Sequence, residues 1–123
     1  MERDQFIIAG PLYLDRNLMK ARSAHNHEFD FNEDEFKALY LLASQEGMAV
    51  SFSNLYKAVW DKGNGTDRLE AARHGLENIM KIINAADGFL MRVAYCPLEG
   101  YTFQTRWSHN MDEWSSSDAH IEI

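Results

Sequence analysis

Apolar residues in the second half of the chain follow first a helical and then an extended period. Five of them recur at alternating spacings of three and four, which places them on one face of a helix: Leu69, Ala72, Leu76, Ile79 and Ile83. The opposite face carries Glu70, Arg73, His74, Glu77, Asn78 and Lys81. After residue 88 the period becomes two, through Met91, Val93, Tyr95, then Tyr101, Phe103, Thr105 and Trp107. The pattern predicts an amphipathic helix over 68–83 followed by a β-hairpin that turns at 96–100.

The first 31 residues hold short apolar runs separated by turn-forming residues. These runs lie at 6–9, 12–14, 18–23 and 27–31. In the last of them, Phe29 and Phe31 alternate with acidic residues, which is typical of a half-buried antiparallel strand. The pattern predicts an antiparallel meander of three or four strands.

Two further helices are predicted between these regions. Asn32 followed by Glu35 has the capping-box pattern of a helix start, and Gly47 is a C-terminal stop signal. The buried face of this helix is predicted to be Phe36, Leu39, Tyr40 and Ala43, with Leu42 beside it. Ser51 or Ser53 can cap a second, short helix that buries Leu55, Val59 and Trp60. Residues 61–66 are predicted to be a flexible connection, and Thr66 or Asp67 can cap the long helix.

Length and composition favour one globular domain. The chain has 123 residues, of which 46% are hydrophobic and 12% aromatic, so it is too apolar to be disordered as a whole. No apolar run is long enough to span a bilayer, and the first residues do not have the pattern of a signal peptide. Cys96 is the only cysteine, so nothing indicates secretion, and we expect a cytoplasmic protein. We expect 1–107 to form the domain and 108–123 a flexible acidic tail.

The charge balance argues against strong binding to a phosphate backbone. The formal net charge is −7, from 12 Lys and Arg against 19 Asp and Glu, whereas such binding depends on basic residues. The excess is uneven: residues 1–31 carry −1, 32–107 carry −2 and 108–123 carry −4. The predicted domain is therefore close to neutral, which weakens the objection without removing it.

Four short motifs lie in an order that resembles one known family. They are LYLD at 12–15, FDFNEDEF at 29–36, GMAVS at 47–51 with the later Leu55, Val59 and Trp60, and GYTF at 100–103. Together they resemble the OmpR/PhoB-type effector domain of bacterial two-component response regulators. The resemblance implies an α+β winged helix-turn-helix: an N-terminal antiparallel meander, three helices and a C-terminal hairpin, the wing.

Several positions depart from the family's pattern. The family's third helix ends in a basic arginine–leucine–arginine–x–lysine run, whereas residues 77–83 contain one basic residue. The family's wing has an arginine after its valine, but here Ala94 follows Val93, the loop to Gly100 is longer, and Arg92 is out of register. The 123 residues also contain no receiver domain, so the chain is a stand-alone relative or a part of something longer.

The resemblance implies a DNA-binding transcriptional regulator, with helix 68–83 in the major groove and the wing at 95–101 on the minor groove or backbone. The candidate DNA-binding residues are Arg68, Arg73, His74, Asn78, Lys81, Arg92 and Arg106. The alternative is a solvated helix face balanced by Glu70 and Glu77. A near-neutral module would bind double-stranded DNA as a homodimer on repeated half-sites.

A protein-interaction module that lost DNA affinity is the second hypothesis. Its partner would be RNA polymerase, another regulator or a second copy, and the acidic tail could cover the DNA-binding surface. Tyr95 is predicted to pack within the wing, whereas Leu98 beside Pro97 favours a contact surface.

Catalytic and metal-binding patterns are not found in the sequence. His25 and His27 share a strand face by their spacing, but they and Cys96 have no recognised ligand spacing. No glycine-rich phosphate loop or serine elbow is present. We therefore expect no enzyme, no metal site and no cofactor.

Overall fold

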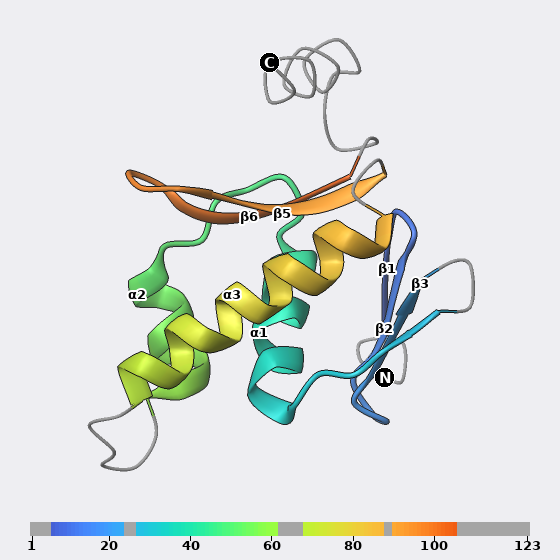
Figure 1. Cartoon of the computed structure of the whole chain (residues 1–123), viewed down its shortest axis with the longest axis horizontal. Coiled ribbons are helices and arrows are strands. Elements are labelled where there is room, and N and C mark those ends of the chain that lie inside the picture. The colour runs from blue at the N-terminus through green and yellow to red at the C-terminus, as the bar shows by residue number, and fades with distance from the viewer. Residues whose placement is uncertain (1–5, 24–26, 62–67, 88–89, 106–123) are drawn as a thin grey trace, which may run out of the picture.

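The N-terminal part of the chain forms an antiparallel sheet, which confirms the predicted meander. The computed structural model describes residues 6–23, 27–61, 68–87 and 90–105. The strands are β1 (Phe6–Ala9), β2 (Leu12–Asp15), β3 (Lys20–Ser23) and β4 (Glu28–Phe29), paired in chain order (Figure 1). Leu12, Leu14 and Ala21 are buried, so alternate residues of the sheet face the core. β3 starts two residues later than predicted, because Met19 has a left-handed φ of 55° in the preceding turn.

Helix α1 (Glu33–Ser44) starts with the predicted capping box. The Asn32 side chain accepts a hydrogen bond from the backbone N–H of Glu35 at 2.7 Å, and the Asn32 backbone N–H donates to Glu35 Oε1 at 3.0 Å. The buried face includes Phe36, Leu39, Leu42 and Ala43, together with Ala38. Tyr40, predicted to be buried, is only half-buried, because the face is centred on Leu39 and Leu42.

The second helix is short and changes its winding. Ser51 caps α2 (Phe52–Leu55) by accepting a hydrogen bond from the Asn54 backbone N–H at 3.1 Å. A π-helical turn, η2 (Tyr56–Trp60), continues it directly. Leu55, Val59 and Trp60 are buried, as the sequence predicted.

Helix α3 (Arg68–Asp87) is the longest element and extends four residues past the predicted end. Ala72, Leu76, Ile79 and Ile83 are fully buried. The prediction that Leu69 joins this face is wrong, because Leu69 is 48% exposed. Gly75 of α3 packs against Trp60. Leu69 lies about 120° around the helix from Gly75, so it does not face Trp60.

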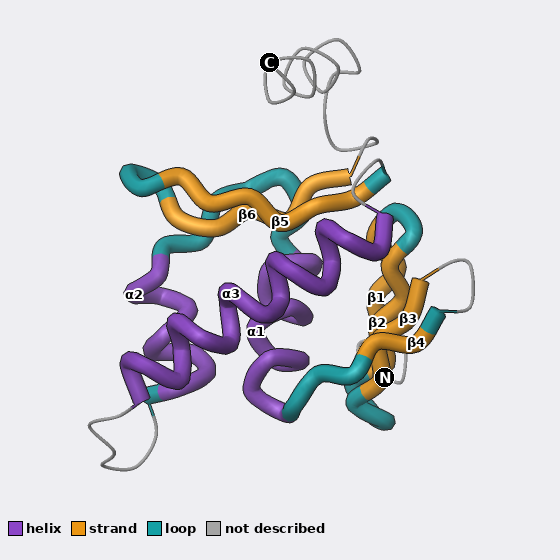
Figure 2. Tube along the Cα trace, in the orientation of Figure 1, coloured by secondary structure: helices purple, strands orange, loops and turns teal. Residues whose placement is uncertain are grey.

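The hairpin consists of β5 (Met91–Cys96) and β6 (Gly100–Thr105). Met91, Val93, Phe103 and Thr105 are buried. The Asn84 side chain fixes β5 to α3, since its amide donates to the Val93 carbonyl at 3.2 Å and its oxygen accepts from the Val93 N–H at 2.8 Å. The hairpin runs alongside α3, and the N-terminal sheet lies near the C-terminal end of that helix (Figure 2).

Some predictions lie outside the described residues: the connection at 62–66, the cap at Thr66 or Asp67, Trp107, and the tail at 108–123. Within the described segments, no helix has both the length and the apolar character needed to cross a membrane.

Candidate nucleic-acid interface

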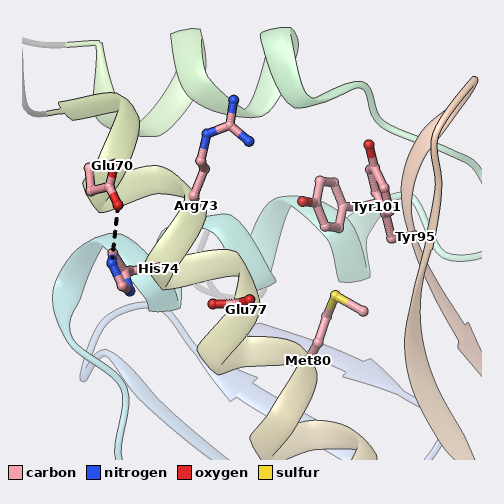
Figure 3. Close-up of a pocket in the computed structure, with 7 residues that line it drawn as sticks. All are labelled: Glu70, Arg73, His74, Glu77, Met80, Tyr95 and Tyr101. Carbon is pink, nitrogen blue, oxygen red and sulfur yellow. Dashed lines mark ion pairs between the residues drawn. The ribbon is translucent and has the colours of Figure 1, made fainter.

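An open groove of about 450 Å³ separates the outer face of α3 from the end of the hairpin. Its lining residues are Glu70, Arg73, His74, Glu77, Met80, Tyr95 and Tyr101 (Figure 3). The five helical residues share this side because residues three, four and seven apart stand one above another on a helix. The groove therefore joins the predicted recognition helix to the predicted wing.

Two polar side chains of α3, Arg73 and His74, each lie close to a neighbouring side chain. The Arg73 guanidinium lies 5.4 Å from the centre of the Phe52 ring, so α2 supports it from the side. His74 Nε2 lies 3.4 Å from Glu70 Oε2, one helical turn away, and both side chains are mostly exposed. Lys81 is also exposed, two turns beyond Arg73.

Two tyrosines form the hairpin side of the groove. Tyr95 and Tyr101 are directly opposite each other in the register, with ring centres 4.7 Å apart. Tyr95 thus packs within the wing as predicted, although it is still 50% exposed. Burial, and then the nearby Tyr95 and Glu77, raise the pKa of Tyr101 above its usual 10.0, against a lowering by Arg73. The Tyr101 phenol is therefore protonated at neutral pH and can donate to an anionic oxygen.

Three of the other predicted site residues are engaged elsewhere. Arg68 Nε donates to the Trp60 carbonyl at 2.9 Å, and its Nη2 lies 3.2 Å from Asp34 Oδ2, so it joins α3 to η2 and α1. Asn78 donates to Glu35 Oε2 at 3.1 Å. Arg92 Nε donates to Gln104 Oε1 at 2.8 Å within the hairpin. Arg106 lies outside the described residues. Of the seven candidates, the structure brings Arg73 and His74 together in the groove.

The sequence did not single out Met80 or Tyr101 as groove residues, nor Phe52 as the support of Arg73. Tyr101 could have been found from the hairpin register, since it pairs with Tyr95. Met80 follows Glu77 at helical spacing, but its apolar character made it resemble a core residue. Phe52 could not have been found, because only tertiary packing brings α2 beside α3.

The charge of this surface is close to balanced. Arg73 and Lys81 stand against Glu70 and Glu77, with His74 able to add a charge when protonated. Among the residues that the structure describes, no group of three or more His, Cys, Asp or Glu side chains could hold a metal ion.

The fold defines the class of protein as a winged helix-turn-helix. The DNA-binding domain of CadC from E. coli superposes with a TM-score of 0.67 at 15% identity, over 82% of this chain and 92% of that one. The DNA-binding domain of CpxR from E. coli superposes with a TM-score of 0.60 at 20% identity, over 81% of this chain and 96% of that one. DrrB from Thermotoga maritima, an OmpR/PhoB homologue, superposes with a TM-score of 0.64 at 19% identity, over 84% of this chain and 46% of that one.

No family model and no curated protein sequence matches the chain. The structural likeness nevertheless confirms the predicted resemblance at the level of the fold. The chain has the fold of OmpR/PhoB-type effector domains, and its own elements run from the N-terminal sheet through the helices to the C-terminal hairpin.

Proposed function

We propose that this chain is a DNA-binding transcriptional regulator, with α3 in the major groove and the wing at the minor groove or the backbone. The observation that carries the proposal is the shared groove: Arg73 and His74 of α3 and Tyr101 of the wing face one open surface. A duplex that contacts one side of this surface also reaches the other. CadC and CpxR, which share the fold, are described as containing DNA-binding domains.

The dimensions of the elements suit this role. The 20 residues of α3 give a helix of about 30 Å, and B-DNA's major groove is wide enough to admit an α-helix. In this proposal the exposed Arg73 and Lys81 contact phosphates, and the protonated Tyr101 phenol, across the groove from Arg73, is a neutral donor. Arg68, Asn78 and Arg92 have structural partners, so we assign them to support of this surface.

A single module offers few cationic contacts. We therefore propose that two copies bind together on repeated half-sites, because the second module doubles the contacts without requiring a basic protein. The expected salt dependence of binding is shallow for each module.

Fluorescence anisotropy with random and genomic duplex DNA at low salt tests the proposal. Arg73→Ala should weaken binding several-fold and reduce the slope of log K against log salt by about 1. Arg22→Ala is a matched control, since Arg22 is also exposed and lies 4.7 Å from the centre of the Tyr13 ring, but on the N-terminal sheet. It should leave binding unchanged. The proposal fails if the full chain binds no duplex at protein concentrations of about 10⁻⁴ M, at the weak end of non-specific affinities.

A protein-interaction module remains the second candidate, and the wing turn favours it. Leu98, in the turn of the hairpin, is 94% exposed, so its apolar side chain is accessible to a protein partner. Binding to purified RNA polymerase that is lost in Leu98→Ser, together with no binding to DNA, would support this candidate over the first.

A further inference from the structure

The outer face of α3 carries two carboxylates. Binding of α3 to phosphates would not explain their presence. Glu70 and Glu77 both line the groove, and Glu77 lies between Arg73 and Met80 along the helix (Figure 3). A carboxylate pressed against DNA is repelled by the phosphates and loses its water, which is costly unless a hydrogen-bond donor replaces that water. We therefore ask which donor the duplex can offer.

The major groove presents two amino donors, N4 of cytosine and N6 of adenine. Beside adenine N6 lies N7, an acceptor, which repels the second oxygen of a carboxylate. Cytosine has no acceptor on that edge. A glutamate in the major groove therefore favours cytosine over the other bases.

Glu77 is better placed than Glu70 for this role. Glu70 is paired with His74 at 3.4 Å. No hydrogen bond or ion pair joins Glu77 to another of the described residues, and its side chain is exposed. Arg73 and Lys81 lie one turn before and one turn after Glu77 on the same stripe, about 12 Å apart along the axis. Two phosphate anchors thus flank one acceptor.

We propose that Glu77 is a specificity residue that accepts a hydrogen bond from a cytosine amino group in the major groove. This inference rests on the proposed DNA-binding function. The carboxylate lowers affinity for every duplex that lacks cytosine at the contacted position. The near-neutral surface of α3 is then selective because it binds duplexes without cytosine at this position more weakly, and not because it attracts all DNA strongly.

Selection of binding sites from a randomised duplex library by the full chain tests the proposal. The wild type should show one position with a cytosine preference of about tenfold. In Glu77→Gln that preference should disappear or shift to adenine, since glutamine can bond both N6 and N7 of adenine. Preferences at the other positions should persist, which also shows that the variant is folded. Glu28→Gln, which removes the same charge from an exposed position of β4, should leave the whole profile unchanged.

The result that overturns the inference is a uniform gain in affinity. If Glu77→Gln binds all duplexes more tightly with an unchanged base profile, Glu77 is only a repulsive charge, and DNA binding itself stands. If the wild type binds no duplex, the proposed function fails and the inference fails with it. The two failures are therefore distinguishable in one set of measurements.

Discussion

At the scale of single residues, Glu35 shows how a charged side chain is used inside this fold. Its carboxylate is buried, and both oxygens are occupied: Oε1 accepts from the Asn32 backbone N–H at 3.0 Å, and Oε2 accepts from Asn78 at 3.1 Å. One side chain therefore caps α1 and joins it to the middle of α3. Asn78 satisfies a buried acceptor, which is a reason for its presence that does not involve DNA.

Asn78→Ala should separate this structural role from a DNA contact. The substitution leaves Glu35 Oε2 without its donor, so we expect the free energy of unfolding to fall by about 1–2 kcal/mol. Urea unfolding measures that loss, and anisotropy should show DNA affinity within about twofold of the wild type, a change below about 0.5 kcal/mol. Arg73→Ala should give the reverse pattern. Unchanged stability with a large loss of DNA affinity would contradict the assignment of Asn78.

Gly75 is required by the space available to it. A Cβ at this position would lie 2.8 Å from Cζ2 of Trp60, whose indole is fully buried and cannot move aside. We expect Gly75→Ala to lower the free energy of unfolding by about 0.5–2 kcal/mol, because overpacking outweighs the gain in helix propensity. Chemical denaturation tests this directly. An equal or higher stability would mean that Trp60 yields more easily than its burial indicates.

At the scale of elements, the wing is joined to the segment between α1 and α2. The Val50 N–H donates to the Tyr101 carbonyl at 2.7 Å, and the Tyr101 N–H donates to the Val50 carbonyl at 2.8 Å. The Gly47 N–H also donates to the Phe103 carbonyl at 2.8 Å. These bonds hold β6 in place, and with it the Tyr101 side of the groove.

Gly100 makes this close approach possible. Its φ is +116°, and a Cβ would lie 2.3 Å from the Val50 carbonyl oxygen. Gly100→Ala should lower the free energy of unfolding by about 2–4 kcal/mol, because it combines backbone strain with a clash against main chain. Thermal and urea unfolding measure the effect. Glu99→Ala, in the exposed turn next to it, should stay within about 0.5 kcal/mol of the wild type. Similar losses in both variants would contradict this explanation.

The elements that could be predicted from the sequence are those with local signals. The capping box at Asn32, the cap at Ser51 and the alternation around Phe29 involve residues within a few positions of each other. Leu69 was placed wrongly because its burial depends on which side of α3 meets Trp60, and periodicity alone does not show that. Only tertiary packing decides the burial of a residue at the edge of the apolar stripe, so the sequence is compatible with either a buried or an exposed Leu69.

The candidate site was predictable only in part, for the same reason. Arg73 and His74 were placed correctly on the outer face because helical spacing defines that face. The carboxylate partners of Arg68 and Asn78 are on α1, 34 and 43 residues away in sequence, so no local pattern indicates them. Polar residues near the edge of a helical stripe therefore need the fold before a role can be assigned.

At the scale of the whole molecule, the negative charge is distributed unevenly along the chain. The formal net charge is −7, and residues 108–123, outside the described part, contribute −4 of it. The groove itself is close to balanced. If the proposed function holds, we expect the net negative charge of the whole chain to oppose the approach of DNA more than the near-neutral groove does.

Neutralising the four acidic residues of 108–123 tests whether their charge opposes DNA binding. We expect Asp112→Asn, Glu113→Gln, Asp118→Asn and Glu122→Gln together to change the net charge from −7 to −3 and to raise non-specific DNA affinity several-fold at low salt. Because the effect is a long-range field, it should fade as salt rises and the screening length falls from about 10 Å at 0.1 M to about 3 Å at 1 M. Anisotropy across a salt series measures it, and the base preference should not change, since the variant leaves α3 intact. A gain in affinity that persists at high salt would instead indicate that these residues touch the proposed DNA-binding surface.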